Sequence, residues 1–349
     1  MTKRSTLNLY QGDGTRLADR GEILPPLEKP VDFTSGSAYL ADPGLRDAVN
    51  VALTLGDPLL LTGEAGCGKT QLAASIAYEF DLGPPLVFNA KSTSGARDLF
   101  YRYDSLRHFH DIQVRGTREP KSVDIRRLRP VASKTSTERR AERPKPVNVL
   151  DYIDFQALGL AVLLSKPPEE VAAYLKPRDR DRGPRRSVVL IDEIDKAPRD
   201  LPNDLLNEIE EMEFTVPEIG KRFQAEAGYR PIVIITSNTE KNLPEAFLRR
   251  CVFYHIEFPN RQRLAEIVRN RINPSDRLNL EEAIDWFLKI REKLRDKKPG
   301  TAELLAWITI LERAEIDLAD PGAVEAIAFT YATLAKTEDD RKLLRDLKF

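Results

Sequence analysis

The sequence predicts an α/β fold in which helices cover both faces of a parallel sheet, followed by a region that consists of helices alone. Three observations support this prediction. Apolar runs of strand length recur within residues 58–258 and alternate with segments of helical spacing. A glycine-rich turn joins one of these runs to the helix that follows it. After Asn260 the strand-like runs stop, whereas helical spacing continues to residue 336.

The composition is that of a globular protein from a reducing compartment. The chain has 349 residues, enough for two or three domains at about 100–200 residues each. Its 54 Lys and Arg residues nearly balance its 55 Asp and Glu residues, so no overall charge favours nucleic acid or an anionic membrane as partner. Cys67 and Cys251 cannot form a disulfide scaffold, and no apolar run reaches the ~18 residues of a membrane span. We therefore expect a cytoplasmic protein without a secretion signal.

The first ordered element expected is a helix over residues 42–55. Residues 1–37 are rich in Gly, Asp and Pro without periodicity, which is typical of an extended arm. Asp42 then supplies a helix cap, and Pro43 occupies the first helical position. The apolar run from Pro58 to Thr62 is predicted to be a buried strand.

The glycine-rich turn GEAGCGKT follows this strand and fits the pattern G-x-x-x-x-G-K-[ST], the phosphate-binding loop at a strand-to-helix junction. Its glycines let main-chain N–H groups approach an anion, Lys69 would reach the β- and γ-phosphates, and the Thr70 hydroxyl would hold Mg²⁺. A helix from Thr70 to Phe80 would direct its positive end at the same charge. A chance match is disfavoured because the required strand and helix flank the turn. The predicted nucleotide-binding residues are Gly63, Glu64, Ala65, Gly66, Cys67, Gly68, Lys69, Thr70 and Gln71.

A second strand is expected over residues 84–90, followed by a helix over residues 96–103 capped by Ser94. Residues 111–150 then hold eleven Lys and Arg against five Asp and Glu and read as an inserted segment. Regular structure resumes with an apolar helix over residues 155–164, before a second basic stretch at 176–186. Basic stretches can contact phosphate backbones or an acidic partner, but a solvated loop is the commoner explanation.

The third strand, SVVLIDEID (187–195), leads to a helix through about Met212 and then to a β-hairpin around residues 214–224. The fourth strand, RPIVIITSN, ends at Asn238, and the fifth covers residues 251–258. A short helix at 243–251 lies between them. The remaining segments with helical spacing are 261–272, 280–297, 301–316 and 321–336.

Hydrolysis of a bound nucleotide requires a metal anchor, a group that activates water, and a sensor of the γ-phosphate. Asp192, at the end of the third strand, would hold Mg²⁺ together with Thr70, and Glu193 would orient and deprotonate the water. Asn238 would contact the γ-phosphate or the water, unless it only caps a turn. Arg249 and Arg250 could be ordinary charges at a helix C-terminus, or could stabilise transition-state charge in a neighbouring subunit.

These motifs, in this order, resemble the AAA+ ATPases over roughly residues 39–336. Three features resemble the MoxR branch: extra chain between the second and third strands, a hairpin before the Asn-tipped strand, and the segment LPEAFLRRC. The resemblance implies a three-layer α/β/α P-loop NTPase with a five-stranded parallel sheet and a helical lid. It implies these roles: Walker A for Lys69 and Thr70, Walker B for Asp192 and Glu193, first sensor for Asn238, and arginine finger for Arg250, with Arg249 as the alternative.

The same resemblance implies domain boundaries and a function. We expect an arm over 1–37, an ATPase core over 38–259 with a basic insert at about 105–155 and a hairpin at about 214–230, and a lid over 260–349. The function implied is that of an ATP- and Mg²⁺-dependent ring, expected to be a hexamer, which remodels a partner protein, often one with a von Willebrand A domain. Two alternatives remain open: a nucleic-acid translocase that uses the basic insert, and a nucleotide-dependent switch or scaffold.

Two departures from the family pattern concern the phosphate site. Many relatives carry a second arginine sensor early in a lid helix, but the stretch DKKPGTAELLAW (296–307) has no arginine after Pro299. Lys298 would be a poor substitute, because an ammonium lacks the planar fork of a guanidinium. Cys67 also places a thiol near the phosphates.

Overall fold

The structure is a computed structural model that describes residues 36–116, 148–180, 183–239, 243–275, 277–294, 297–316, 318 and 327–345. Nearly all of the expected N-terminal arm lies outside these residues, and so does most of the basic insert. None of the helices within the described ranges is both long and apolar enough to cross a membrane.

The central sheet has five parallel strands in the order β2-β5-β8-β1-β9, as the sequence predicts for the fold class. The first strand along the chain therefore lies between the fourth and the fifth. Because all strands run in one direction, their carboxyl ends meet at one edge. The strands are β1 (Leu59–Gly63), β2 (Leu86–Asn89), β5 (Val188–Asp192), β8 (Ile232–Thr236) and β9 (Val252–Ile256).

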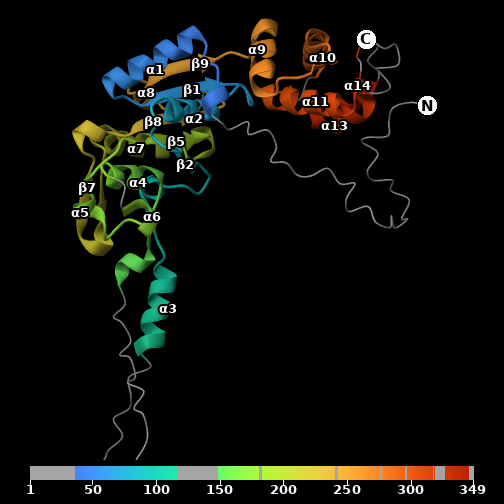
Figure 1. Cartoon of the computed structure of the whole chain (residues 1–349). Helices are drawn as coiled ribbons and strands as arrows, with labels where there is room; N and C mark the ends of the chain where they lie inside the picture. The colour runs from blue at the N-terminus through green and yellow to red at the C-terminus, as the bar shows by residue number, and fades with distance from the viewer. Residues whose placement is uncertain are drawn as a thin grey trace, which may run out of the picture.

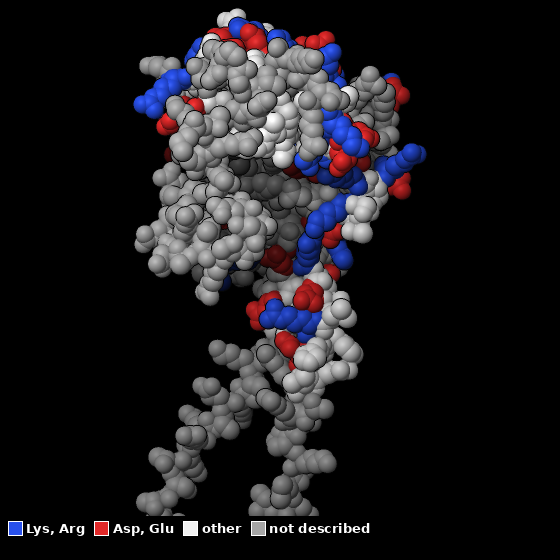
Figure 2. Space-filling view, turned by 90° about the vertical axis from the view of Figure 1, so that its right-hand side faces the viewer, with Lys and Arg blue, Asp and Glu red and all other residues white. Residues whose placement is uncertain are grey.

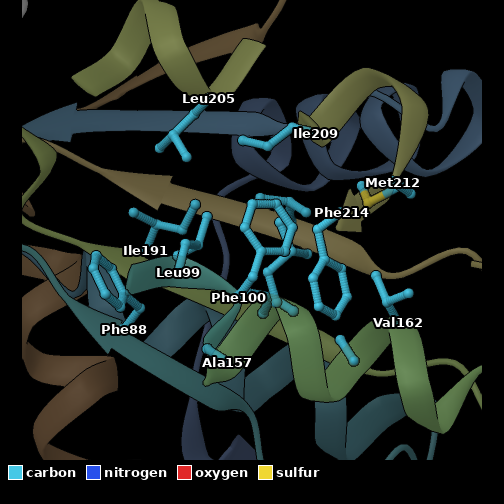
Figure 3. Close-up of a cluster of buried hydrophobic side chains, with 14 of the residues drawn as sticks. Phe88, Leu99, Phe100, Ala157, Val162, Ile191, Leu205, Ile209, Met212 and Phe214 are labelled. Carbon is cyan, nitrogen blue, oxygen red and sulfur yellow. The ribbon is translucent and has the colours of Figure 1, made fainter. Parts of the chain in front are cut away.

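Helices cover both faces of this sheet. Successive residues of one strand enter different cores: Leu59 and Leu61 pack with α1 and α2, whereas Leu60 packs with α4 and α7. Figure 3 shows the second of these cores. This alternation explains why the strands are apolar at every position rather than at every second one. The helices concerned are α1 (Pro43–Leu55), α2 (Lys69–Glu79), α4 (Ala157–Leu164) and α7 (Leu201–Glu211).

The segment after β2 differs from its predicted helix. Residues 96–103 form a short 3₁₀ turn, η4 (Ala96–Leu99), and then β3 (Tyr101–Tyr103), which pairs antiparallel with β4 (Ile153–Phe155). The Ser94 hydroxyl accepts a hydrogen bond from the Lys91 N–H at 3.0 Å instead of capping a helix. Tyr101 is buried beside Phe214 of the hairpin, so a tertiary contact determines the extended conformation here.

The described ends of the insert are α3 (Ser105–Gly116), which projects away from the sheet in Figure 1, and η5 (Val149–Tyr152). The predicted hairpin is present as antiparallel β6 (Glu213–Val216) and β7 (Lys221–Gln224), joined by η7 (Pro217–Ile219). Short helical segments fill the remaining connections: α5 (Pro168–Val171), α6 (Pro177–Arg180), η6 (Ile194–Lys196), η8 (Ala227–Tyr229) and α8 (Glu245–Leu248).

After β9 the regular elements of the described residues are all helices, and these helices lie beside the sheet (Figure 1). They have a hydrophobic cluster of their own around the fully buried Phe287 and Trp307. The last helix, α14, was not predicted from the sequence. In order, the elements are α9 (Arg261–Arg271), α10 (Leu280–Lys293), α11 (Thr301–Arg313), η9 (Ala328–Thr330), α13 (Tyr331–Leu334) and α14 (Glu338–Arg345). We call this region, residues 261–345, the lid.

Candidate functional site

The phosphate loop, residues 64–68, connects β1 to α2 at the carboxyl edge of the sheet. Gly63, Gly66 and Gly68 have φ angles of 141°, 79° and 99°, in a region that side chains rarely adopt. A Cβ atom at Gly63 would also lie 2.5 Å from the carbonyl oxygen of Ile256. Glycine is therefore required at these three positions for the backbone to turn from the strand into the helix.

Lys69 is directed into this loop. Its Nζ donates hydrogen bonds to the carbonyl oxygens of Gly63 and Glu64 at 2.7 and 2.8 Å, and the residue is only 7% exposed. An ammonium has three donors, so these two bonds leave one for a phosphate oxygen. The lysine also lies in the first turn of α2, whose N-terminal N–H groups attract the same anion.

Thr70 and Asp192, the two residues expected to hold Mg²⁺, lie side by side although 122 residues separate them. The Thr70 hydroxyl lies 3.1 Å from a carboxylate oxygen of Asp192. Asp192 also accepts a hydrogen bond from the Thr236 hydroxyl at 2.5 Å. One carboxylate and one hydroxyl fit Mg²⁺, which proteins bind through one or two such groups together with substrate phosphates. Among the described residues, no group of three or more His, Cys, Asp or Glu side chains is placed so that it could hold a metal ion.

Glu193 directly follows β5 and has left-handed backbone angles, φ 56° and ψ 50°. Its N–H donates to the Thr236 hydroxyl at 2.9 Å, so the end of the neighbouring strand holds this conformation. Its carboxylate forms an ion pair with Lys196, and that hydrogen bond raises the pKa of Lys196. The turn places Glu193 at the same edge of the sheet as Asp192.

Asn238 lies two residues beyond β8, at the same edge. Its N–H donates to the Asp195 carboxylate at 3.1 Å, and its side chain is exposed. Asn89, which the sequence reading did not single out, ends β2 directly opposite Asp192. Polar residues thus follow three adjacent parallel strands where each one ends.

Arg249 and Arg250 directly follow the short helix α8 and contact acidic residues of α8 and α7. Arg249 pairs with Glu245, and Arg250 lies 3.3 Å from Glu210. Their side chains are 76% and 48% exposed. The structure thus presents both arginines at the surface.

A cavity of about 630 Å³ opens between the phosphate loop and the lid. Cys67, Gly68 and Gln71 line it on the loop side, Leu305 on the lid side. Tyr39, just before α1, closes another wall, and burial raises the pKa of its hydroxyl. No pattern in the sequence indicates this cavity, because its walls come from segments far apart in the chain.

The lid approaches the phosphate loop directly. The Thr301 N–H donates to the Gly66 carbonyl at 3.2 Å, and a Cβ atom at Gly300 would lie 2.9 Å from the Gly66 Cα. Lys298, which the sequence analysis considered a poor substitute for a second sensor arginine, is exposed. Instead Arg291 of α10, which the sequence analysis did not identify, reaches the loop by an ion pair with Glu64.

A family model described as "ATPase family associated with various cellular activities (AAA)" matches residues 59–260. Among solved structures, the crystal structure of domain III from the Thermotoga maritima replication initiation protein DnaA is similar. The identity is 13%, the match covers 90% of this chain and 96% of that chain, and the TM-score is 0.37. No curated protein matches this chain.

Proposed function

The chain belongs to the AAA family of ATPases and is therefore a P-loop ATP hydrolase, and we propose that it works as a MoxR-type ring that remodels or activates a partner protein. The proposal rests on the family and on the arrangement at the carboxyl edge of the sheet. The observation that carries the hydrolytic part is the 3.1 Å contact between Thr70 and Asp192, beside Lys69 and Glu193.

In the proposed reaction the loop N–H groups and Lys69 bind the phosphates. Thr70 and Asp192 would hold Mg²⁺, which, when bound, neutralises charge on the β- and γ-phosphates. Glu193 orients the attacking water and accepts its proton, and Asn238 donates its amide to the water or to the γ-phosphate. The cavity between loop and lid receives the nucleoside. Arg250, or alternatively Arg249, reaches the site of an adjacent subunit.

Three features support the MoxR branch and none of them concerns the phosphate loop. The chain between β2 and β5 contains the projecting α3, the β6–β7 hairpin precedes β8, and LPEAFLRR precedes β9. We accordingly place the ATPase core at residues 38–259 and the lid domain at 260–349. The similarity to the MoxR branch also favours a hexameric ring and a client such as a von Willebrand A domain protein.

A nucleic-acid client is the weaker alternative. On the described part of the face drawn in Figure 2, Lys and Arg side chains lie beside Asp and Glu side chains, so no field of one sign is apparent there. The basic insert lies mainly outside the described residues. Stimulation of the ATPase by polynucleotide would favour this alternative.

The test compares wild type with Glu193→Gln. We expect the variant to bind Mg·ATP with an affinity like that of wild type but to turn over at least 100-fold more slowly, since general base catalysis contributes about 10²–10⁴-fold. Turnover is measured by phosphate release over a range of protein concentrations, and mass is determined with β,γ-imido-ATP. Unchanged turnover in the variant would exclude Glu193 as the base, and a monomeric mass with the analogue would exclude the ring.

A further inference from the structure

Arg291 is a buried arginine of the lid that touches three separate parts of the chain. The residue is 8% exposed. One guanidinium nitrogen donates to the Pro299 carbonyl at 2.6 Å, another forms an ion pair with Glu64, and the guanidinium carbon lies 3.6 Å from the centre of the Phe258 ring. An arginine with these three contacts is held in one geometry.

The three contacts of Arg291 lie in three different parts of the structure. Phe258 lies in the linker between β9 and α9, Pro299 lies just before α11, and Glu64 belongs to the phosphate loop. The guanidinium therefore connects the linker, the lid and the loop at one point. The neighbouring bond from the Thr301 N–H to the Gly66 carbonyl shows that the lid rests on the loop here.

Glu64 connects the lid to the group that would bind phosphate. Its carbonyl oxygen accepts from Lys69 Nζ at 2.8 Å, while its carboxylate pairs with Arg291. A shift of Lys69 toward a phosphate therefore acts on the same residue that Arg291 holds. The start of α11, by contrast, offers no arginine, since residues 300–307 read GTAELLAW.

We infer that Arg291 is a positioning residue that couples closure of the lid to nucleotide binding, acting through the carboxylate of Glu64. The inference rests on the proposed binding of ATP at the phosphate loop. The pair also neutralises Glu64, whose negative charge would otherwise stand beside a triphosphate. Removing either partner leaves the charge of the other unpaired. The loss of stability is larger when the unpaired charge is that of the buried arginine.

Glu64→Gln is the decisive variant, because two explanations of the role of Glu64 predict opposite changes in nucleotide affinity. The Glu64 side chain is 56% exposed, so the substitution threatens the fold little. If Glu64 only repels phosphate, the loss of its charge tightens binding. If it holds the lid through Arg291, the loss weakens binding, and we expect the Kd for β,γ-imido-ATP with Mg²⁺ to rise about tenfold by calorimetry.

Arg291→Met should have the same effect, and the double variant should bind no more weakly than the weaker single variant, since both remove one interaction. Arg261→Met is the matched control: it removes an exposed lid arginine that pairs with Glu281 and Asp285, and should stay within twofold of wild type.

Hydrogen exchange reports the lid without any catalytic assay. The Thr301 amide is bonded across the interface to Gly66, so a peptide covering residues 297–305 should exchange faster in Glu64→Gln and Arg291→Met than in wild type or Arg261→Met. Unchanged exchange, tighter binding in Glu64→Gln, or effects that multiply in the double variant would each overturn the inference. Because binding and exchange are measured without turnover, these results stand even if Glu193→Gln refutes the proposed hydrolytic mechanism.

Discussion

The two cysteines lie in surroundings that keep their thiols protonated. Burial raises the pKa of Cys67, against an opposing effect of Lys69, and burial raises the pKa of Cys251 from 9.0 to about 12. The thiolate is the reactive form, so burial makes both side chains poor nucleophiles at neutral pH. The thiol in the phosphate loop is thus a packing group.

The raised pKa of Cys251 has a consequence for stability at high pH. An unfolded thiol loses its proton near pH 9, whereas the folded one keeps it to about pH 12, so its contribution is intact below pH 9 and is lost between these values. We expect the free energy of unfolding to fall more steeply over pH 9–12 in wild type than in Cys251→Ala. Urea titrations at several pH values measure this, with Cys67→Ala as the matched variant for the other thiol. Equal slopes in wild type and Cys251→Ala would show that the thiol does not titrate as its burial requires.

Single residues of the site divide into those that sequence can identify and those that it cannot. Lys69, Thr70, Asp192 and Glu193 stand in short contiguous patterns whose chemistry is local, and the structure brings them to one edge of the sheet. Arg291 lies in a helix whose sequence shows no motif. It becomes part of the site only through its contact with Glu64, 227 residues earlier in the chain. No periodicity encodes such a contact.

At the scale of elements, the predictions held where a pattern depends on local geometry. Asp42 caps α1 by accepting from the Leu45 N–H at 2.9 Å, and the alternating residues around Gly220 form the hairpin. The helix predicted over residues 96–103 was wrong, because the Phe and Tyr side chains of this segment pack against the hairpin. Local helical spacing does not reveal such a contact. Helix boundaries were also displaced: α10 ends at Lys293, before the 297 expected.

The hairpin is held by an aromatic cluster, which gives a test at this scale. Phe214 is 6% exposed and stacks on Phe100 with ring centres 4.9 Å apart. We expect Phe214→Ala to lower the free energy of unfolding by about 3–5 kcal/mol, the usual cost of emptying a buried aromatic site. Thr215→Ala, at the exposed neighbouring position, should change it by no more than about 0.5 kcal/mol. Chemical denaturation of the two variants decides the point; similar losses in both would mean that the hairpin is held by something other than this cluster.

For the whole molecule, the sequence predicted the kind of sheet but not its order. Continuous apolar strands alternating with helices indicate a parallel sheet, yet β1 lies between β8 and β9, far along the chain. This order matters for function because it places the phosphate loop, which follows β1, next to the polar ends of β8 and β5. The proposed cooperation between subunits likewise depends on contacts that no pattern within one chain encodes.

Arg250 bears on that cooperation. Its ion pair with Glu210 is 3.3 Å long, with both side chains about half exposed, so giving it up costs no more than about 1 kcal/mol. The arginine is therefore available to a neighbouring subunit. If it acts there, Arg250→Ala and Glu193→Gln fail for different reasons: the first protein keeps its own base but donates no arginine, and the second donates an arginine but has no base.

Mixing the two inactive proteins should therefore restore hydrolysis. In a mixed ring some Arg250→Ala subunits receive the arginine of a Glu193→Gln neighbour, and only these sites turn over, so phosphate release should peak near equal amounts of the two. An arginine in trans is worth about 10³–10⁵-fold in rate, so even a minority of complete sites exceeds either protein alone. Arg249→Ala mixed with Glu193→Gln tells the two arginines apart, because it gains from mixing only if Arg249 is the finger. If neither mixture exceeds the sum of its parts, each subunit hydrolyses ATP with its own residues alone.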